Sequence, residues 1–410
     1  MATSQIENKI SKDKNILLVL QNDQDTISEL QSLINTFCGK VVNSFSDDLV
    51  ERNDIRLYVC GDIQKLTEKK TPLYIIKELS VHYENHTNEN ARIITLGEVP
   101  IIVSNAGVYF RNLFADDDYF SKIKSEHVFQ ELTESNKQSK ALRKGIYLTK
   151  ITKEESKEGN AILHYRLLRC SSNLTGPTDN FRATDHKIIN LLNDLVRYVF
   201  EQETELNHVL VQIYENKRKT IDTEKEVKSK IKAHSDKTKD MPKDGLIAFC
   251  TFYDNLTSEH LKRSTTDRYD LCYKQTSALT RLHFKLKSSV SDDTLEKEFS
   301  VTLYPNSVFI IPLSTNRLYT HKIRPSTLGV DQIPTRMGYV VRCSNAEALY
   351  MNDQVYIKEN IGLIKLEEMT PELQQNLKDS YYEENVSEKL IEYGKIHFSM
   401  NSGDYEKPIY

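Results

Sequence analysis

The sequence predicts a mixed α+β protein with a double-stranded β-helix, or jelly roll, at its centre, supporting helices around it and a small α/β unit before it. Three observations lead to this prediction. A series of short runs rich in β-branched and aromatic residues fills much of the stretch from residue 207 to residue 343. No helical pattern separates these runs, which is typical of an antiparallel sandwich. The first 105 residues instead alternate strand-like runs with a helix-like one.

Residues 1–105 are predicted to form the small α/β domain. Residues 15–20 (NILLVL) have the composition of a short buried strand, and residues 27–37 place apolar side chains at helical spacing. Residues 55–60 and 91–96 are further strand candidates. The stretch contains no glycine-rich phosphate loop, so the sequence indicates no nucleotide site there, and we assign this domain no chemistry.

Residues 106–345 are predicted to form the jelly-roll domain. An amphipathic helix follows Asp185, which we interpret as its N-cap, and its apolar stripe runs from Ile188 to Phe200. We interpret this helix as one that packs on the core. The predicted strands are residues 208–214, 245–253, 282–286, 299–304, 307–313 and 336–343.

Residues 346–410 are predicted to form an acidic, partly helical C-terminal extension. From residue 345 onward there are 13 Asp and Glu against 6 Lys, a net charge of −7. The part from Pro371 has the composition of an exposed helix. We interpret this charge as a solvated face without chemistry.

Composition limits the class of protein. The hydrophobic fraction of 39% and the charged fraction of 28% are typical of a soluble globular chain, and the net charge of −4 does not favour a general polyanion binder. The six cysteines include no C-x-x-C pair, which argues against a zinc ribbon or a disulfide framework. The polar N-terminus and the lack of a long apolar run predict a cytoplasmic or nuclear protein without a membrane partner.

The most informative segment is His234-Ser235-Asp236. On a strand, residues i and i+2 point to the same face, so the imidazole and the carboxylate could reach one metal ion. His82-Tyr83-Glu84 has the same spacing but lies in a helix-like region, where the two side chains would diverge. His321 follows the predicted strand 307–313 and its turn, and it supplies a second imidazole. Two histidines and one carboxylate form the facial triad that suits divalent iron and leaves three positions open.

A predicted strand further along the chain, RMGYVVR, has arginine at both ends. The spacing of six places Arg336 and Arg342 on one face of the strand, with Gly338 between them leaving room for a ligand. Buried arginines are unusual, and a dicarboxylate would satisfy them through bidentate charge-assisted bonds. The alternative is that these arginines pair with acidic residues at a sheet edge.

The order His-x-Asp, distant His and Arg-x5-Arg resembles the AlkB-like branch of the 2-oxoglutarate/Fe(II)-dependent dioxygenases. Residues 207–214 (NHVLVQIY) are similar to the family strand N-x-x-L-x-N-x-Y, with Tyr214 matching and Gln212 where Asn is usual. The resemblance covers residues 207–342, about a third of the chain. A longer, lysine-rich insert before His234 departs from the family pattern.

The resemblance implies that His234, Asp236 and His321 hold Fe(II), with 2-oxoglutarate and O2 as co-substrates. It also implies that Arg336 binds the far carboxylate of 2-oxoglutarate, with assistance from other side chains. These assisting residues are Arg342, Tyr214 and Gln212. The reaction expected from the family is oxidative hydroxylation or demethylation.

The substrate is left open between several classes. Alkylated nucleic acid bases are one candidate, because residues 207–243 carry ten Lys and Arg against six Asp and Glu, most of them in the segment 217–243. The alternatives are a solvated loop there and a protein (prolyl or lysyl) or small-molecule hydroxylase. A non-catalytic jelly-roll binding module is a second alternative. The lack of a G-x-S-x-G motif disfavours a hydrolase.

Overall fold

The computed structural model describes residues 7–20, 28–44, 54–66, 72–85, 90–114, 117–134, 137–155, 159–170, 174–218, 225–254, 256 and 259–410. It is a mixed α+β structure in which antiparallel sheets predominate and helices are few. Within this part of the chain, no helix is long and apolar enough to cross a membrane.

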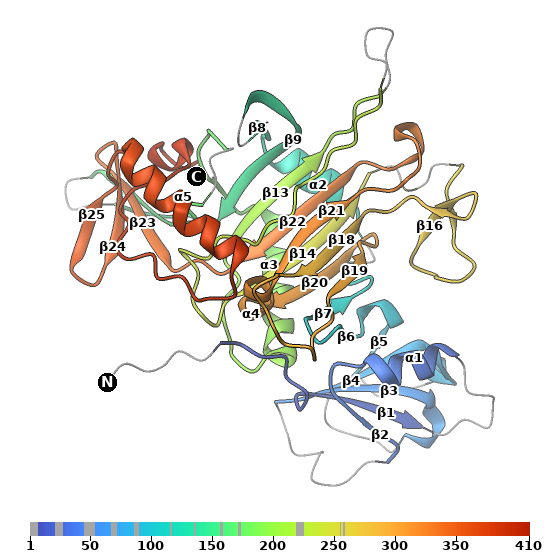
Figure 1. Cartoon of the computed structure of the whole chain (residues 1–410). Coiled ribbons are helices and arrows are strands. Elements are labelled where there is room, and N and C mark those ends of the chain that lie inside the picture. Colours follow the sequence, from blue (N-terminus) through green and yellow to red (C-terminus); the bar gives the residue numbers. More distant parts are fainter. Residues whose placement is uncertain are drawn as a thin grey trace.

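The largest layer is an antiparallel sheet, drawn in green, orange and teal in Figure 1. Among the described residues it has nine strands, in the order β12-β9-β13-β22-β14-β20-β7-β6, with β8 paired to β9. Only β12 runs parallel to its neighbour. The strands are β6 (Ile101–Val103), β7 (Gly107–Phe110), β8 (Gln130–Glu134), β9 (Lys137–Thr149), β12 (Asp179–Asn180), β13 (His208–Tyr214), β14 (Leu246–Tyr253), β20 (Ser307–Pro312) and β22 (Arg336–Arg342).

A smaller antiparallel sheet lies against one face of the large sheet. Its order is β19 (Glu298–Thr302), β18 (Arg281–Leu286) and β21 (Tyr319–Arg324). Phe249 and Phe309 of the large sheet share one buried cluster with Phe284 and Val301 of the small one. Two sheets around one core form a sandwich, as the series of strands without intervening helices predicts. The arrangement is consistent with the predicted jelly roll, whose full connectivity stays a prediction.

Helices cover the other face of the large sheet. They are α2 (Tyr119–Glu126) and α3 (Ala183–Val199), whose apolar stripe includes Ile188 and Leu192 and packs on strand residues such as Val341. The predicted core-packing role of this helix is therefore confirmed. The predicted N-cap was wrong: the cap residue is Arg182, three residues before Asp185, and Asp185 Oδ2 accepts a bond from the Arg182 backbone N–H at 2.7 Å.

Residues 15–94 form a separate parallel sheet of order β2-β1-β3-β4-β5 (blue in Figure 1). The α1 helix (Ser28–Thr36) packs on one face of it. Lys14 Nζ and Asn15 Nδ2 donate to carbonyl oxygens at the C-terminal end of α3, so this sheet docks on the helix. The strands are β1 (Asn15–Leu20), β2 (Lys40–Val42), β3 (Arg56–Asp62), β4 (Leu73–Val81) and β5 (Ala91–Ile94).

The C-terminal stretch contributes to a third sheet and then forms a helix, after which residues 387–410 are mostly irregular. Its sheet is shared with earlier strands in the order β10-β11-β23-β24-β25. The predicted helix from Pro371 is present as α5 (Pro371–Val386), but Leu377, Tyr381 and Glu384 are buried, so the expectation of a merely solvated face was wrong. The remaining elements are β10 (Thr152–Glu155), β11 (Ala161–Leu167), β15 (Lys262–Arg263), β16 (Leu271–Tyr273), β17 (Thr276–Ser277), α4 (Leu313–Leu318), β23 (Ala346–Met351), β24 (Gln354–Glu359) and β25 (Gly362–Lys365).

Candidate metal centre

His321 lies on β21, the edge strand of the small sheet, and is 4% exposed. The segment with His234 is not a strand, contrary to the sequence prediction. It meets β21 at one isolated bridge, where the backbone N–H and C=O of His234 and His321 exchange hydrogen bonds of 3.0 and 2.7 Å. This bridge places the two imidazole rings 4.5 Å apart, centroid to centroid.

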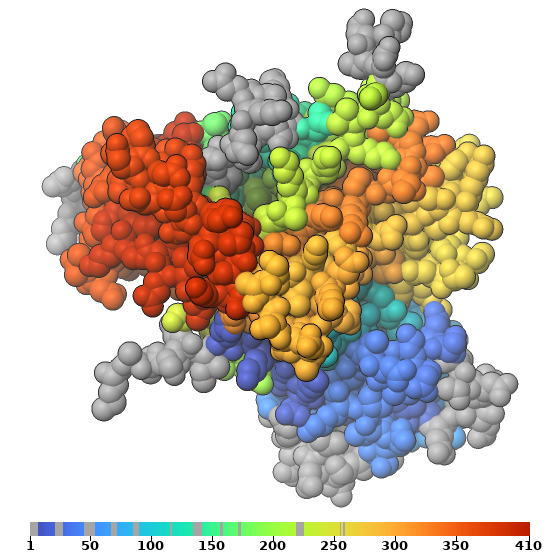
Figure 2. Space-filling model, viewed as in Figure 1, coloured from blue at the N-terminus to red at the C-terminus, as the bar shows by residue number. Residues whose placement is uncertain are grey.

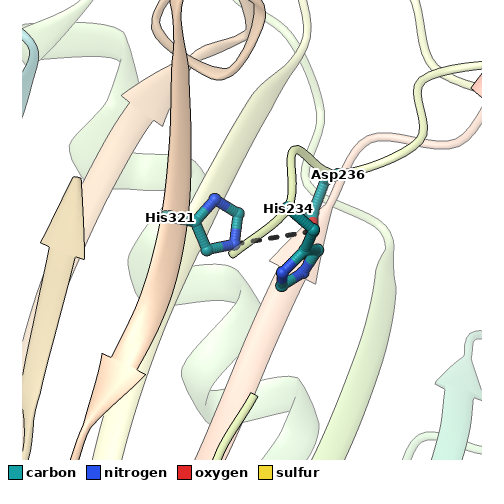
Figure 3. Close-up of side chains that lie close together, drawn as sticks. All are labelled: His234, Asp236 and His321. Atoms are coloured by element: carbon teal, nitrogen blue, oxygen red, sulfur yellow. Dashed lines mark ion pairs between the residues drawn. The ribbon is translucent and has the colours of Figure 1, made fainter. Parts of the chain in front are cut away.

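Asp236 is brought to the same point by an amide clamp. Asn316 of α4 accepts a bond from the Asp236 backbone N–H at 2.7 Å and donates to the Asp236 carbonyl at 2.8 Å. Asp236 Oδ1 then lies 3.5 Å from His234 Nε2 and 3.8 Å from His321 Nε2 (Figure 3). Two ligands about 2.1 Å from an ion and at right angles are about 3 Å apart, so a small closure would suffice.

The chemistry of the two imidazoles suits metal ligation. His234 Nδ1 lies 2.9 Å from the carbonyl oxygen of Lys232, which can only accept, so Nδ1 donates this bond and Nε2 is the nitrogen directed at Asp236. Burial, together with the positive charge that His234 can carry, lowers the pKa of His321 to about 3. His321 is therefore neutral at pH 7, as a ligand must be.

The guanidinium of Arg342 forms an ion pair with Asp236. Its Nε and Nη2 donate to Asp236 Oδ2 at 2.8 and 2.7 Å, which leaves Oδ1 toward the histidines. Burial opposes ionisation of Asp236, but Arg342 and His234 outweigh burial and hold the pKa of this carboxyl well below its usual range. The guanidinium of Arg342 is thus engaged by a metal-ligand candidate, and its assistance to 2-oxoglutarate stays a prediction.

Arg336, at the other end of the same strand, has no acidic partner among the described residues. It is 5% exposed, and its guanidinium carbon lies 3.7 Å from the centroid of the Tyr214 ring. Its Nη2 is buried without a hydrogen-bond partner. A Cβ at Gly338 would come within 3.0 Å of Arg336 Nη1 and 3.3 Å of Tyr214 Cε2, so the glycine is what leaves room here.

Gln212 lies on the same strand as Tyr214 and accepts a bond from its hydroxyl at 3.1 Å. The residue where the family has Asn therefore holds the tyrosine in place. Direct contact of Gln212 with a co-substrate stays a prediction.

A small pocket lies beside Arg336, and its lining includes none of His234, Asp236 and His321. It is lined by Tyr214 and Arg336 of the large sheet and by Ile323 of β21, along with Asn216 and Thr280. Ile323 is two residues beyond His321, so both point to the same face of β21. The donor set of two imidazoles and one carboxylate fits Fe(II), and the orphaned guanidinium fits a carboxylate.

A second group of potential ligands consists of Glu126, His127 and Asp185 on the helix side of the large sheet. Both ring nitrogens of His127 are occupied: Nδ1 lies 2.8 Å from Asp179 Oδ2 and Nε2 lies 2.8 Å from Asp185 Oδ2. Burial lowers the pKa of His127, but these two carboxylates outweigh it and raise the pKa to about 9. The cluster fits an imidazolium ion held between two acids better than a metal site.

The basic segment 217–243 is divided between surface and interior, and its residues 219–224 lie outside the described residues. Lys237 Nζ donates to the Cys170 carbonyl at 2.9 Å, and Lys239 Nζ pairs with Asp240 at 2.8 Å with a side chain only 3% exposed. Lys225, Lys230 and Lys232 are exposed. Among the described residues of this segment, fewer lysines are free on the surface than its composition indicates.

Sequence reasoning missed the groups that hold the site in place. Asn316, Glu384 and Asn385 bond the segment that carries His234 and Asp236. All three are distant in sequence, and nothing in their local pattern distinguishes them from ordinary helix residues.

Comparison with known proteins adds little to this geometry. No protein-family model matches the chain. No curated protein sequence matches it either. The solved structure of OsALKBH1 is similar over 58% of this chain and 97% of that chain, with 12% sequence identity and a TM-score of 0.31. A similarity of this extent carries no argument about activity, so the functional argument depends on the site itself.

Proposed function

We propose that the chain is an Fe(II)- and 2-oxoglutarate-dependent dioxygenase. The observation that carries this proposal is the pairing of two incomplete sites in one sandwich: three converging ligand atoms, and a buried guanidinium nitrogen without a partner. A structural metal site would need no separate carboxylate anchor. A simple anion site would need no triad of metal ligands.

In this proposal His234, His321 and Asp236 hold the metal, and Arg342 keeps Asp236 ionised with one oxygen directed inward. Arg336 binds the distal carboxylate of 2-oxoglutarate, with the Tyr214 ring beneath it. When bound, Fe(II) and 2-oxoglutarate supply, with O2, the oxidising power for C–H hydroxylation. The chain's own residues bind and orient these groups and exclude water from the pocket.

The rival reading is a non-catalytic binding module of the same fold. It is disfavoured because the sequence retains each residue that the resemblance implies for the metal and the anchor, whereas a degenerate site would normally have lost one of them.

Anaerobic titration of the purified protein with Fe(II) and 2-oxoglutarate tests the proposal. We expect the weak visible charge-transfer band of the metal–keto acid chelate in the wild type and its loss in His234→Ala. His82→Ala is the matched control, because His82 has the same His-x-acid spacing and bonds only Asp62. Absence of the band in metal-replete wild-type protein would overturn the proposal.

Nucleic acid is the substrate class with a specific observation in its favour. Lys230 and Lys232 are exposed within four residues of the partly exposed His234, so cationic groups stand beside the metal centre. The hydroxylation of a protein or small molecule is the alternative, and the two are separated by the binding experiment given in the Discussion.

A further inference from the structure

The segment 234–238 carries two of the three proposed ligands, yet it has little regular backbone support of its own. Among the described residues, its contacts with the sandwich include the bridge to His321 and the Asn316 clamp on Asp236, and the Thr238 carbonyl accepts a bond from the Met241 N–H. A ligand side chain displaced by about 1 Å no longer converges with its partners. The bridge and the clamp hold His234 and Asp236 themselves, so a further contact is needed to fix the backbone between and after them.

Two consecutive residues near the C-terminal end of α5 provide that support. Asn385 Oδ1 accepts a bond from the backbone N–H of Ser235, the residue between the two ligands, at 2.7 Å. Glu384 Oε1 accepts a bond from the backbone N–H of Thr238 at 3.1 Å and also bonds the Thr238 hydroxyl. The helix thus bonds the segment at the centre of the ligand pair and directly after it.

The helix end is itself fixed to the core. Lys287 Nζ donates to the carbonyl oxygens of Glu384 and Ser387 at 2.6 and 3.1 Å, and the Tyr393 hydroxyl bonds the Glu384 carboxylate. Asn385 Nδ2 donates back to the Tyr381 carbonyl at 2.9 Å, which orients its Oδ1 toward Ser235. Glu384 is 6% exposed.

Side-chain packing joins the same two elements. Lys237, the residue after Asp236, places its Nζ 4.2 Å from the centroid of the Tyr381 ring, and Tyr381 is 3% exposed. Figure 2 shows the red C-terminal part lying against the body of the molecule beside yellow-green and orange-yellow segments. The contact between α5 and the ligand segment is therefore a packed interface.

We propose that the C-terminal helix α5 supports the segment that carries two ligands of the metal centre, and that Asn385 is a positioning residue for the His234–Asp236 pair. Asn385 touches neither metal nor co-substrate; it acts through the Ser235 backbone. The inference rests on the proposed metal centre. By linkage, metal binding must stabilise the docked helix as much as the docked helix strengthens metal binding.

The test is the affinity of the metal-free full-length chain for Mn(II), measured by calorimetry without any turnover. We expect Asn385→Ala to bind Mn(II) about 10-fold more weakly or worse, the range seen for outer groups that orient ligands. Asn385→Asp keeps an acceptor for the Ser235 N–H but loses the amide donor to the Tyr381 carbonyl, so its affinity for Mn(II) should lie between those of wild type and Asn385→Ala. Asn376→Ala is the matched control: an exposed asparagine on the same helix, whose side chain makes no hydrogen bond within the described part of the chain.

The failures of the two proposals are distinguishable. If His234→Ala binds Mn(II) as well as wild type does, the metal centre itself is wrong and the inference goes with it. If His234→Ala loses Mn(II) while Asn385→Ala and Asn376→Ala both bind like wild type, the metal centre stands and the positioning role is overturned.

A second measurement covers a variant that does not fold. In wild-type protein, Mn(II) should slow hydrogen exchange of the backbone amides of residues 381–387, and it should not do so in His234→Ala. Equal exchange in wild type with and without bound Mn(II) would contradict the coupling between helix and metal centre.

Discussion

Arg336 and Arg342 are chemically identical and lie on one face of one strand, but their surroundings give them different roles. Arg342 is neutralised by Asp236 through two bonds to one oxygen. Arg336 has a ring beneath it and a buried nitrogen with no acceptor. Because Arg342 and Asp236 neutralise each other, removing Arg342 would destabilise the folded apo protein. A buried charge without a partner, such as Arg336, costs free energy until a ligand binds.

Removal of the unpaired arginine should affect ligand binding and leave folding intact. We expect Arg336→Ala to weaken 2-oxoglutarate binding to the Mn(II) form by about 30-fold or more, since truncating a buried charge pair costs about 2 kcal/mol at least. Calorimetry checks this. Arg281→Ala, at an exposed arginine of β18, is the control, and an unchanged 2-oxoglutarate affinity in Arg336→Ala would contradict the anchor.

Removal of the paired arginine should affect folding before any ligand is added. Arg342→Ala leaves the Asp236 carboxylate buried without its counter-ion, and the free energy of unfolding of the apo protein should fall by about 3 kcal/mol or more. Urea denaturation of apo Arg342→Ala and apo Arg336→Ala gives the comparison. Equal stabilities of the two variants would mean that Arg342 is not committed to Asp236.

At the scale of elements, the N-terminus of α3 is joined to the residue that follows α2 by a charged cluster. His127 bridges Asp179 and Asp185, Arg182 donates to both of these acids, and the Tyr339 hydroxyl of β22 bonds Asp185. The cluster ties the helix layer to the large sheet through a histidine held between two carboxylates, which raise its pKa to about 9.

This cluster gives stability a defined pH dependence. The folded pKa of His127, about 9, lies above the value near 6.5 of an unfolded chain. Its contribution is therefore fully present below pH 6.5 and is lost as pH rises through 9. The difference in free energy of unfolding between wild type and His127→Gln should shrink by about 3 kcal/mol from pH 6 to pH 9.5.

Urea denaturation at several pH values checks this prediction, and subtraction of the variant removes the titration of other groups. A difference that does not change with pH would mean that His127 is neutral in the folded protein. In that case the reading of Glu126, His127 and Asp185 as a metal site would regain support.

At the scale of the whole molecule, two further parts of the structure dock on the sandwich. The parallel sheet docks on the C-terminal end of α3. The C-terminal extension packs against the segment that carries His234 and Asp236. Lys225, Lys230 and Lys232 are exposed and lie ahead of His234 in the chain.

These exposed lysines allow a test of nucleic acid as the substrate class. If single-stranded nucleic acid binds there, replacing Lys225, Lys230 and Lys232 by Ala should lower the slope of log affinity against log salt by about 2, at about 0.7 for each lost phosphate contact. Fluorescence anisotropy with a labelled oligonucleotide measures this. The matched control replaces three exposed lysines of the extension, Lys389, Lys395 and Lys407, and we expect it to leave the slope unchanged.

Equal binding by both triple variants would remove nucleic acid as a partner of this segment. A protein or small-molecule substrate would then be the leading class. The metal centre and its co-substrate anchor would be unaffected by that outcome.

The sequence by itself determined the elements whose pattern is local. The strands at 208–214, 246–253, 307–312 and 336–342 follow from β-branched and aromatic runs, and α3 follows from its 3.6-residue stripe. The residue types of the triad and of the arginine pair were also readable, because their chemistry is rare in a core.

Only the tertiary structure decided which of these groups meet. His234 and Asp236 converge with His321 through one bridge and an asparagine clamp and not through a strand. Arg342 turns to Asp236 while Arg336 stays free, and α5 closes the site from the far end of the chain. Periodicity reports which way a residue faces within its own element, whereas a partner many residues away is chosen by packing, which no local pattern encodes.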